Sequence, residues 1–216
     1  TNKKKIILCV PNTLIHFFYK KLKSKYLSLG VQNCHYHQGY GSFTGSVNAS
    51  MLKKVGAEYI ILGHSENRSE GETNQLIKKK IISALNQKLN IIFCIGETYK
   101  EKKRGKTFSI LRAQIRSSLE RKFNINKIIF AYEPIWSIGT NEIPKMDELK
   151  NIIKFIKKDF KRIFKTKKTP KVLYGGSVND KNIRLFSSIS EIDGFLIGGA
   201  SQSSKKFIDI VKNYYK

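Results

Sequence analysis

Long hydrophobic runs are missing from this sequence. Although 40% of its 216 residues are hydrophobic, no uninterrupted apolar stretch approaches the ~20 residues that a membrane-spanning helix needs. The basic start, Asn2 to Lys5, is followed by only five apolar residues, which is too few for a signal peptide. We therefore expect a cytoplasmic protein that has no membrane partner.

Cysteine and proline are scarce as well. The three cysteines, Cys9, Cys34 and Cys94, each lie in or beside an apolar run and show no spacing typical of a metal site. A sparse, odd set like this indicates buried, reduced thiols and not a disulfide framework. The four prolines form no tract, and no linker is visible. The sequence therefore predicts a single domain over residues 1–216.

Acidic residues are few. The chain has 16 aspartates and glutamates against 41 lysines and arginines, which gives a formal net charge of +25. Clustered lysines bind polyanions by releasing counterions, so this charge is compatible with nucleic acid as a partner. The lysines are instead scattered along helical segments, as at positions 53–54, 78–80 and 157–158, which is typical of solvated helix faces. We expect no nucleic acid as a partner, and a basic surface that attracts a phosphorylated substrate.

Short β-branched apolar runs recur along the chain. The seven runs are Ile6–Val10, Val31–Cys34, Tyr59–Leu62, Ile91–Ile95, Ile128–Tyr132, Val172–Tyr174 and Phe195–Ile197. Each of the first six is followed by a segment with helical periodicity. Strands that alternate with helices predict a parallel sheet covered by helices.

The residues suited to chemistry follow the strands. They are Gly63 to Glu66, Gly96-Glu97, Glu133-Pro134, Gly175 to Ser177 and Gly198-Gly199. This is the pattern of an α/β protein of the (β/α)8 barrel type, whose sites are built from the loops after the strands. An open doubly wound sheet is the alternative, but no G-x-G-x-x-G turn follows an early strand.

Two of these residues could carry acid–base chemistry. Glu133 directly follows an apolar strand and precedes a small-residue loop tip, which suits a general base under a movable lid. A helix-capping or surface glutamate is the alternative. His64 precedes residues that suit the first turn of a helix, whose dipole would lower its pKa and keep it neutral. A histidine satisfied by loop backbone is the alternative there.

Two glycine turns suggest a divided phosphate site. Gly175 and Gly176 precede Ser177, and Gly198-Gly199 follow the next strand. Backbone N–H groups can approach an anion at such glycines because no Cβ stands in the way. Glycine turns after the last two strands are a frequent phosphate site in barrels.

Five motifs, in order and with matching spacing, resemble the triosephosphate isomerase family. They are Leu62–Glu66, Cys94–Glu97, Ala131–Thr140, Tyr174–Val178 and Asp193–Ser201. The resemblance runs from about Ile7 to the C-terminus. It implies a TIM barrel that interconverts dihydroxyacetone phosphate and D-glyceraldehyde 3-phosphate in glycolysis and gluconeogenesis, by enediolate proton transfer and without a cofactor.

The resemblance also implies a role for each matching residue. Glu133 is the base, His64 is the neutral electrophile, and Glu66 helps to organise the site, a division of labour known for this enzyme family. By the same resemblance, the residues that bind the substrate's phosphate are Gly139, Ser177, Gly198 and Gly199. The segment from Gln32 to Gly45 resembles a loop that delivers a threonine, here Thr44, to a partner subunit, which implies a homodimer.

One feature of the family has no match in the sequence. The family's first strand ends in an Asn-x-Lys motif, whereas Asn2 and Lys4 lead directly into the run that matches the second strand. The first methionine is Met51, so we expect a fragment or a processed product with seven of the eight βα units. The alternatives are a non-catalytic truncated relative that binds phosphorylated ligands, and a basic barrel that binds nucleic acid.

We predict that the upstream coding sequence holds an in-frame extension of ~30 to 40 residues, the length of one strand-crossover unit. It should contain an apolar run that ends in Asn-x-Lys. Sequencing the genomic locus or the full transcript tests this. A stop codon directly upstream would contradict it.

Overall fold

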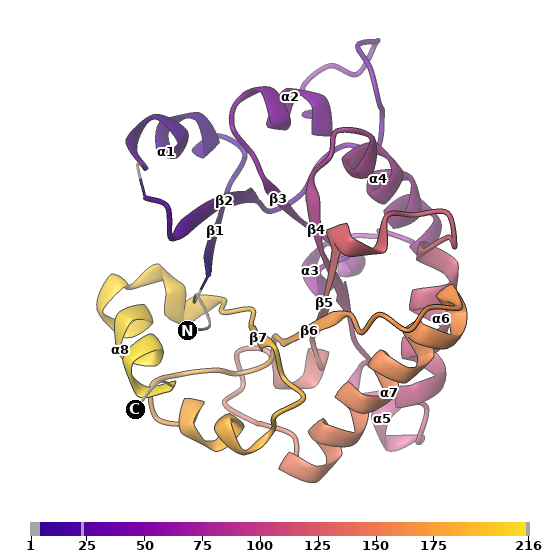
Figure 1. The fold of residues 1–216 in the computed structure, drawn as a ribbon, viewed down its shortest axis with the longest axis vertical. Helices are drawn as coiled ribbons and strands as arrows, with labels where there is room; N and C mark the ends of the chain where they lie inside the picture. Colours follow the sequence, from indigo (N-terminus) through magenta and orange to yellow (C-terminus); the bar gives the residue numbers. More distant parts are fainter. Residues whose placement is uncertain (1–4, 23, 215–216) are drawn as a thin grey trace. The chain divides into compact units, whose positions relative to one another are not determined.

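A computed structural model describes residues 5–22 and 24–214 of the chain (Figure 1). Asn2 and Lys4 lie outside the described residues. The chain forms two compact units, a first unit of residues 1–93 and 117–129 and a second unit of residues 94–116 and 130–216. The single domain over residues 1–216 stays a prediction.

The strands are parallel, and neighbours in each unit follow chain order, β1-β2-β3-β4 and β5-β6-β7. Their bounds are β1 Ile6–Val10, β2 Leu27–Val31, β3 Tyr59–Leu62, β4 Asn90–Ile95, β5 Ile128–Tyr132, β6 Lys171–Tyr174 and β7 Gly194–Phe195. In the first unit Ile6 lies opposite Leu27 and Tyr59 lies opposite Asn90. In the second unit Leu173 lies opposite Gly194.

Helices separate the strands along the chain. The α-helices are α1 Ile15–Lys21, α2 Ala49–Lys54, α3 Ser65–Ser69, α4 Asn74–Asn86, α5 Tyr99–Lys103, α6 Thr107–Ser118, α7 Met146–Phe164 and α8 Ser204–Tyr214. Short 3-10 helices are η1 Ile125–Lys127, η2 Ile135–Ser137, η3 Ile183–Ser188 and η4 Gly199–Gln202. The predicted alternation is confirmed, except that β6 is followed by η3 and not by an α-helix. No helix within residues 5–22 and 24–214 combines the length and apolar character needed to cross a membrane.

The second predicted strand was placed wrongly. The sequence predicts Val31–Cys34, whereas β2 covers Leu27–Val31. The reason is Gly30, where a Cβ would lie 2.6 Å from the Cys9 sulfur and 3.1 Å from the Tyr59 Cβ. Glycine weakens the strand signal in the sequence, but here it permits β2 to pack closely against its neighbours.

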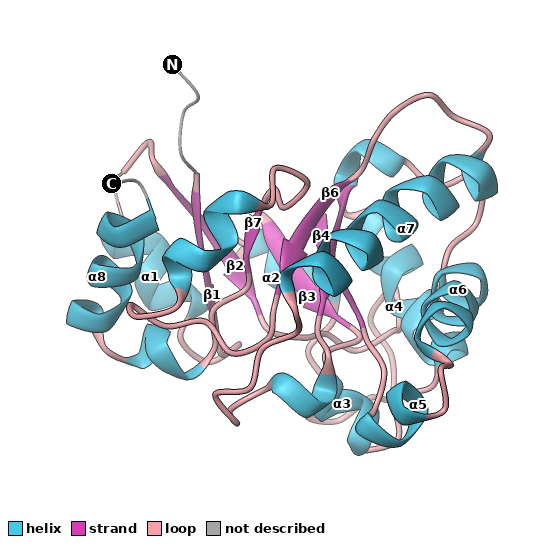
Figure 2. Cartoon of the chain, turned by 90° about the horizontal axis from the view of Figure 1, so that it is seen from below, coloured by secondary structure: helices cyan, strands magenta, loops and turns pink. Residues whose placement is uncertain are grey.

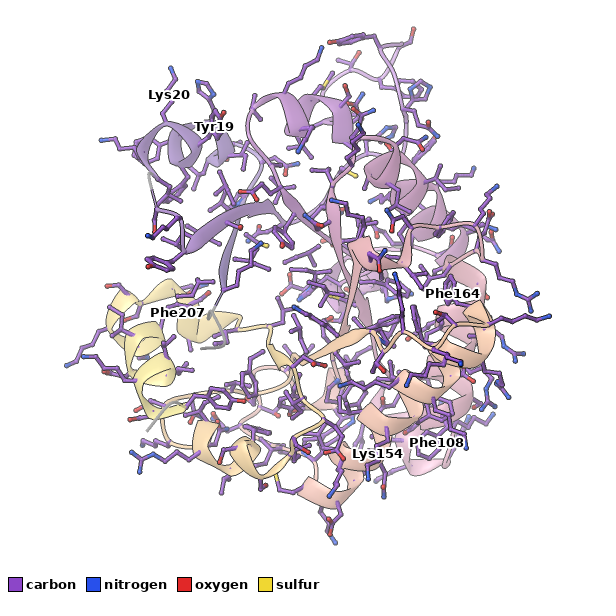
Figure 3. The ribbon with its side chains drawn as sticks, viewed as in Figure 1. Tyr19, Lys20, Phe108, Lys154, Phe164 and Phe207 are labelled. Carbon is purple, nitrogen blue, oxygen red and sulfur yellow. The ribbon has the colours of Figure 1, made fainter. Side chains whose placement is uncertain are left out.

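Helix α7 shows how sequence pattern becomes packing in the second unit. Its buried apolar positions follow the period of a helix and are Leu149, Ile152, Ile153, Ile156 and Phe160. This stripe covers β6, beside which α7 lies (Figure 2). Phe108 of α6 packs on Phe155 of α7 with ring centroids 4.7 Å apart, and Figure 3 shows Phe108 near the α7 residue Lys154.

A buried ion pair stabilises the first unit. Lys80 of α4 pairs with Glu72, and both bond to Asn33, whose Oδ1 accepts from Lys80 at 3.0 Å and whose Nδ2 donates to Glu72 at 3.0 Å. Both charged side chains are about nine-tenths buried. Breaking such a pair is costly, because the remaining charge stays buried without compensation.

We predict that Lys80→Ala lowers the free energy of unfolding by about 3–5 kcal/mol, since it leaves Glu72 uncompensated. Urea denaturation followed by circular dichroism measures this. Lys79→Ala, at an exposed position of the same helix, is the control and should change stability by less than about 1 kcal/mol. Equal effects of the two variants would contradict the prediction.

Candidate active site

Glu133 is buried directly after β5 in the second unit, with 2% of its surface exposed. Its backbone N–H donates to the Ile95 carbonyl at 2.8 Å. A Cβ at Gly96 would lie 1.8 Å from the Glu133 carbonyl oxygen, and a Cβ at Gly175 would lie 2.9 Å from its Cγ. Because residues 96 and 175 are glycines, their backbone segments can pack directly against Glu133. This packing limits the positions that the Glu133 carboxylate can take.

The loop after Glu133 folds back on itself. Thr140 Oγ1 donates to the Trp136 carbonyl at 3.1 Å and accepts from the Glu142 N–H at 3.1 Å. Gly139 and Asn141 have φ of 71° and 63°, a left-handed conformation that glycine and asparagine adopt most readily. We call residues 134–142 the lid.

The lid is tied to the glycine turn after β6. The Asn141 N–H donates to Ser177 Oγ at 3.1 Å, and the Ser177 N–H donates to Ser137 Oγ at 3.2 Å. Leu196, after β7, donates its N–H to the Tyr174 carbonyl at 2.9 Å. The structure thus brings together four elements that sequence reasoning assigned to one site: the base, the lid and the two glycine turns.

The second glycine turn is open. Gly198 and Gly199 are exposed, and a Cβ built on either would meet nothing within 4 Å. Packing therefore does not require glycine at these two positions. Open backbone without side chains is what an anion needs to reach N–H groups.

Glu97 is a buried residue of the same unit that the sequence analysis placed among the residues after the strands but gave no individual role. Its carboxylate accepts from the Tyr132 hydroxyl at 3.1 and 3.2 Å and from Trp136 Nε1 at 3.1 Å. Burial raises the pKa of Glu97, and the indole hydrogen bond opposes that rise. Lys102 lies 3.6 Å from the centroid of the Trp136 ring. Glu97 therefore anchors the first turn of the lid. The sequence signals for it were its position after a strand and its place in the motif Cys94–Glu97.

His64 and Glu66 lie together in the first unit. His64 is the N-cap of α3, and its Nδ1 accepts from the Glu66 N–H at 3.3 Å. An imidazole nitrogen that accepts carries no proton, so in the neutral ring the proton is on Nε2. The side chain of His64 is 25% exposed, whereas that of Glu66 is 83% exposed, with a carboxylate oxygen 3.7 Å from Nδ1.

Thr44 belongs to the loop that joins β2 to α2 in the first unit (Figure 1). The loop is organised by aromatic packing, with His37 and Phe43 ring centroids 3.9 Å apart. Asn48 ties it back through a 2.8 Å hydrogen bond to the Gly39 carbonyl. Thr44 is exposed next to Gly45, which has a φ of 78°.

Within the described part of the chain, no three His, Cys, Asp or Glu side chains are grouped as a metal site requires.

Comparison with known proteins gives one consistent answer. The family model described as triosephosphate isomerase matches residues 1–214. The chain is 42% identical to the triosephosphate isomerase of Dictyoglomus thermophilum, over 98% of this chain and 86% of that protein. It is 37% identical to that of Aquifex aeolicus, with the same two coverages. A crystal structure of the enzyme from Bartonella henselae, 34% identical, superposes with a TM-score of 0.88 over 98% of this chain and 86% of that chain.

We predict that Trp136→Phe raises the pKa of Glu97 further, because it removes an N–H that stabilises the carboxylate. A group whose folded pKa lies above its unfolded value contributes stability at low pH. That contribution is lost as the pH rises from the ordinary value of 4.5 through the folded pKa. The variant should therefore lose more stability than the parent as the pH rises from 4.5 through the folded pKa of Glu97.

NMR titration of carboxyl-labelled glutamate measures the pKa, and urea denaturation at several pH values measures the stability. Tyr99→Phe, on an exposed ring of α5, is the control. An unchanged or lowered Glu97 pKa in the variant would contradict the prediction.

Proposed function

The chain belongs to the triosephosphate isomerase family and interconverts dihydroxyacetone phosphate and D-glyceraldehyde 3-phosphate, and we propose that Glu133 is its catalytic base. The predicted TIM-barrel fold is confirmed by the family match and the structural superposition. The observation that carries the proposal for Glu133 is its burial between two close glycine segments at the start of the lid.

The proposed chemistry moves one proton between two carbons. The Glu133 carboxylate removes a proton from the carbon beside the carbonyl and returns it to the neighbouring carbon, through an enediolate intermediate. His64 supplies a proton from Nε2 to the carbonyl oxygen and takes one back from the adjacent oxygen, as is known for this enzyme family. The hydrogen bond that its Nδ1 accepts from Glu66 N supports a proton on Nε2. The exposed Glu66 carboxylate is proposed to help organise this histidine.

We propose that the substrate's phosphate lies at the two glycine turns and the lid tip. Gly198 and Gly199 supply backbone N–H groups there, Ser177 supplies its hydroxyl, and Gly139 supplies an N–H from the lid. The open space at Gly198 and Gly199 supports this assignment. The net charge of +25 favours the approach of a dianionic substrate.

The lid has a chemical purpose in this scheme. An enediolate that is exposed to water can lose its phosphate, so the intermediate must be covered while the proton moves. The hydrogen bond from the Asn141 N–H of the lid to Ser177 Oγ supports this role, because a lid that covers the intermediate must be bound to the phosphate-site turn.

The proposed partner is a second copy of the chain. The loop that carries Thr44 is exposed at its tip and organised by its own aromatic residues, which supports insertion into a partner subunit. The proposed location is the cytoplasm.

We predict that Glu133→Gln lowers kcat by about a hundred- to ten-thousand-fold, because the amide cannot accept the substrate proton. Binding of inorganic phosphate, measured by calorimetry, should stay within about twofold, since the glycine turns are unchanged. A dehydrogenase-coupled assay in both directions measures kcat.

Glu70→Gln, an exposed glutamate in the first unit, is the matched control and should retain full activity. Near-normal turnover of the Glu133 variant would overturn the assignment of the base. Phosphate binding without any turnover by the parent chain would favour the non-catalytic alternative.

A further inference from the structure

A serine hydroxyl is buried inside the lid of the second unit. Ser137 is the last residue of η2 and has no exposed surface. Its Oγ lies 2.6 Å from the Glu142 carbonyl oxygen, 3.1 Å from the Tyr174 hydroxyl and 3.2 Å from the Ser177 backbone nitrogen. The proposed chemistry above gives this hydroxyl no role.

The direction of each hydrogen bond follows from the partners. A serine hydroxyl has one proton to donate and two lone pairs that accept. The Glu142 carbonyl can only accept, so it takes the Ser137 proton, and the Ser177 N–H can only donate. Tyr174 must therefore donate its phenolic proton to Ser137. The three bonds use the full capacity of the Ser137 hydroxyl.

These partners come from separate segments that a closed lid has to keep together. Ser137 belongs to the first turn of the lid and Glu142 to its far end, while Tyr174 and Ser177 flank the glycine turn after β6. One hydroxyl therefore joins both ends of the lid to a turn of the proposed phosphate site.

Gly176 leaves free the space that the Ser137 and Tyr174 hydroxyls occupy. A Cβ at Gly176 would lie 2.2 Å from the Tyr174 hydroxyl and 2.6 Å from Ser137 Oγ. Any side chain there would displace one of the two groups. Gly176 thus serves the hydrogen bond between Ser137 and Tyr174, in addition to the turn itself.

We propose that Ser137 is a positioning residue that holds the lid closed over Glu133 through its three hydrogen bonds. The proposal rests on the function proposed above, because a lid matters only if an intermediate must be covered. Ser137 touches neither the substrate nor the base in this scheme. Its loss should weaken closure and leave the proton-transfer groups unchanged.

The Tyr174 donor persists across the working pH range. Burial raises the pKa of Tyr174 to about 12. The phenol therefore keeps its proton in neutral and mildly alkaline solution. The pH profile of kcat should be the same in the parent and in Ser137 variants, since neither Glu133 nor His64 is altered.

We predict that Ser137→Ala lowers kcat/KM about tenfold, the effect of losing roughly one net hydrogen bond. Most of the loss should be in kcat. The share of turnovers that end in phosphate elimination should rise about tenfold, because the enediolate loses its phosphate with the C–O bonding electrons when water has access. Coupled assays for isomerisation and for released inorganic phosphate measure the two products.

The single tryptophan of the chain offers a readout that does not depend on activity. It is Trp136, the residue before Ser137. Titration with inorganic phosphate should change its fluorescence in the parent, and the change should be smaller in Ser137→Ala. Ser187→Ala is the matched control, because its hydroxyl makes one bond to a backbone carbonyl at an exposed position. The control should behave as the parent in every assay.

Tyr174→Phe keeps the proposal testable if Ser137→Ala does not fold, as judged by thermal melting. It removes the donor to Ser137 without emptying the lid and should act in the same direction. The loss of kcat/KM in the double variant should be smaller than the product of the two single losses, because both substitutions remove the hydrogen bond between Ser137 and Tyr174.

Parent values of kcat/KM, elimination share and fluorescence in Ser137→Ala would overturn the proposal, as would independent effects in the double variant. An inactive parent would instead count against the proposed function. The fluorescence titration would then still report whether Ser137 controls the lid.

Discussion

The close approach of Gly96 to Glu133 is the constraint on which the second unit's site depends. With a Cβ at Gly96 only 1.8 Å from the Glu133 carbonyl oxygen, any other residue would force the two segments apart. The same contact allows the Glu133 N–H to reach the Ile95 carbonyl and the Ile135 N–H to reach the Glu97 carbonyl. The proposed base and the first turn of the lid thus start from one rigid point.

That rigid point also explains why a carboxylate is buried at Glu97. Its hydrogen bonds to Tyr132 and Trp136 connect the end of β5 to the lid, and burial of the carboxylate is compensated only if both donors are present. Lys102 adds a cation over the face of the indole ring. The lid therefore leaves β5 from an anchored tryptophan, while the tip beyond it is tied through Ser177.

Local sequence signals predicted the fold well and the site in part. The runs Ile6–Val10, Tyr59–Leu62 and Ile128–Tyr132 coincide with strands. In the last two runs most residues are buried, whereas in the first only Val10 is buried. Gly30 misled the prediction of β2. Glycine is needed there because a side chain would collide with residues of the two neighbouring strands, which the local sequence does not show. The role of Glu97 could not be read from its neighbours, because its two partners are 35 and 39 residues away. The same holds for Ser137, which looks in the sequence like any small loop residue.

The energetics of the lid explain why a buried hydroxyl would be placed in it. Fixing the backbone of each lid residue costs roughly 1–2 kcal/mol, and the left-handed conformation of Asn141 adds about 1 kcal/mol. Each hydrogen bond returns only about 1 kcal/mol net. The hydrogen bonds of the lid offset only part of this ordering cost, and the proposed closure depends on the difference between the two. A residue that makes three hydrogen bonds with one side chain, as Ser137 does, shifts that difference toward the closed form at the entropic cost of a single short side chain.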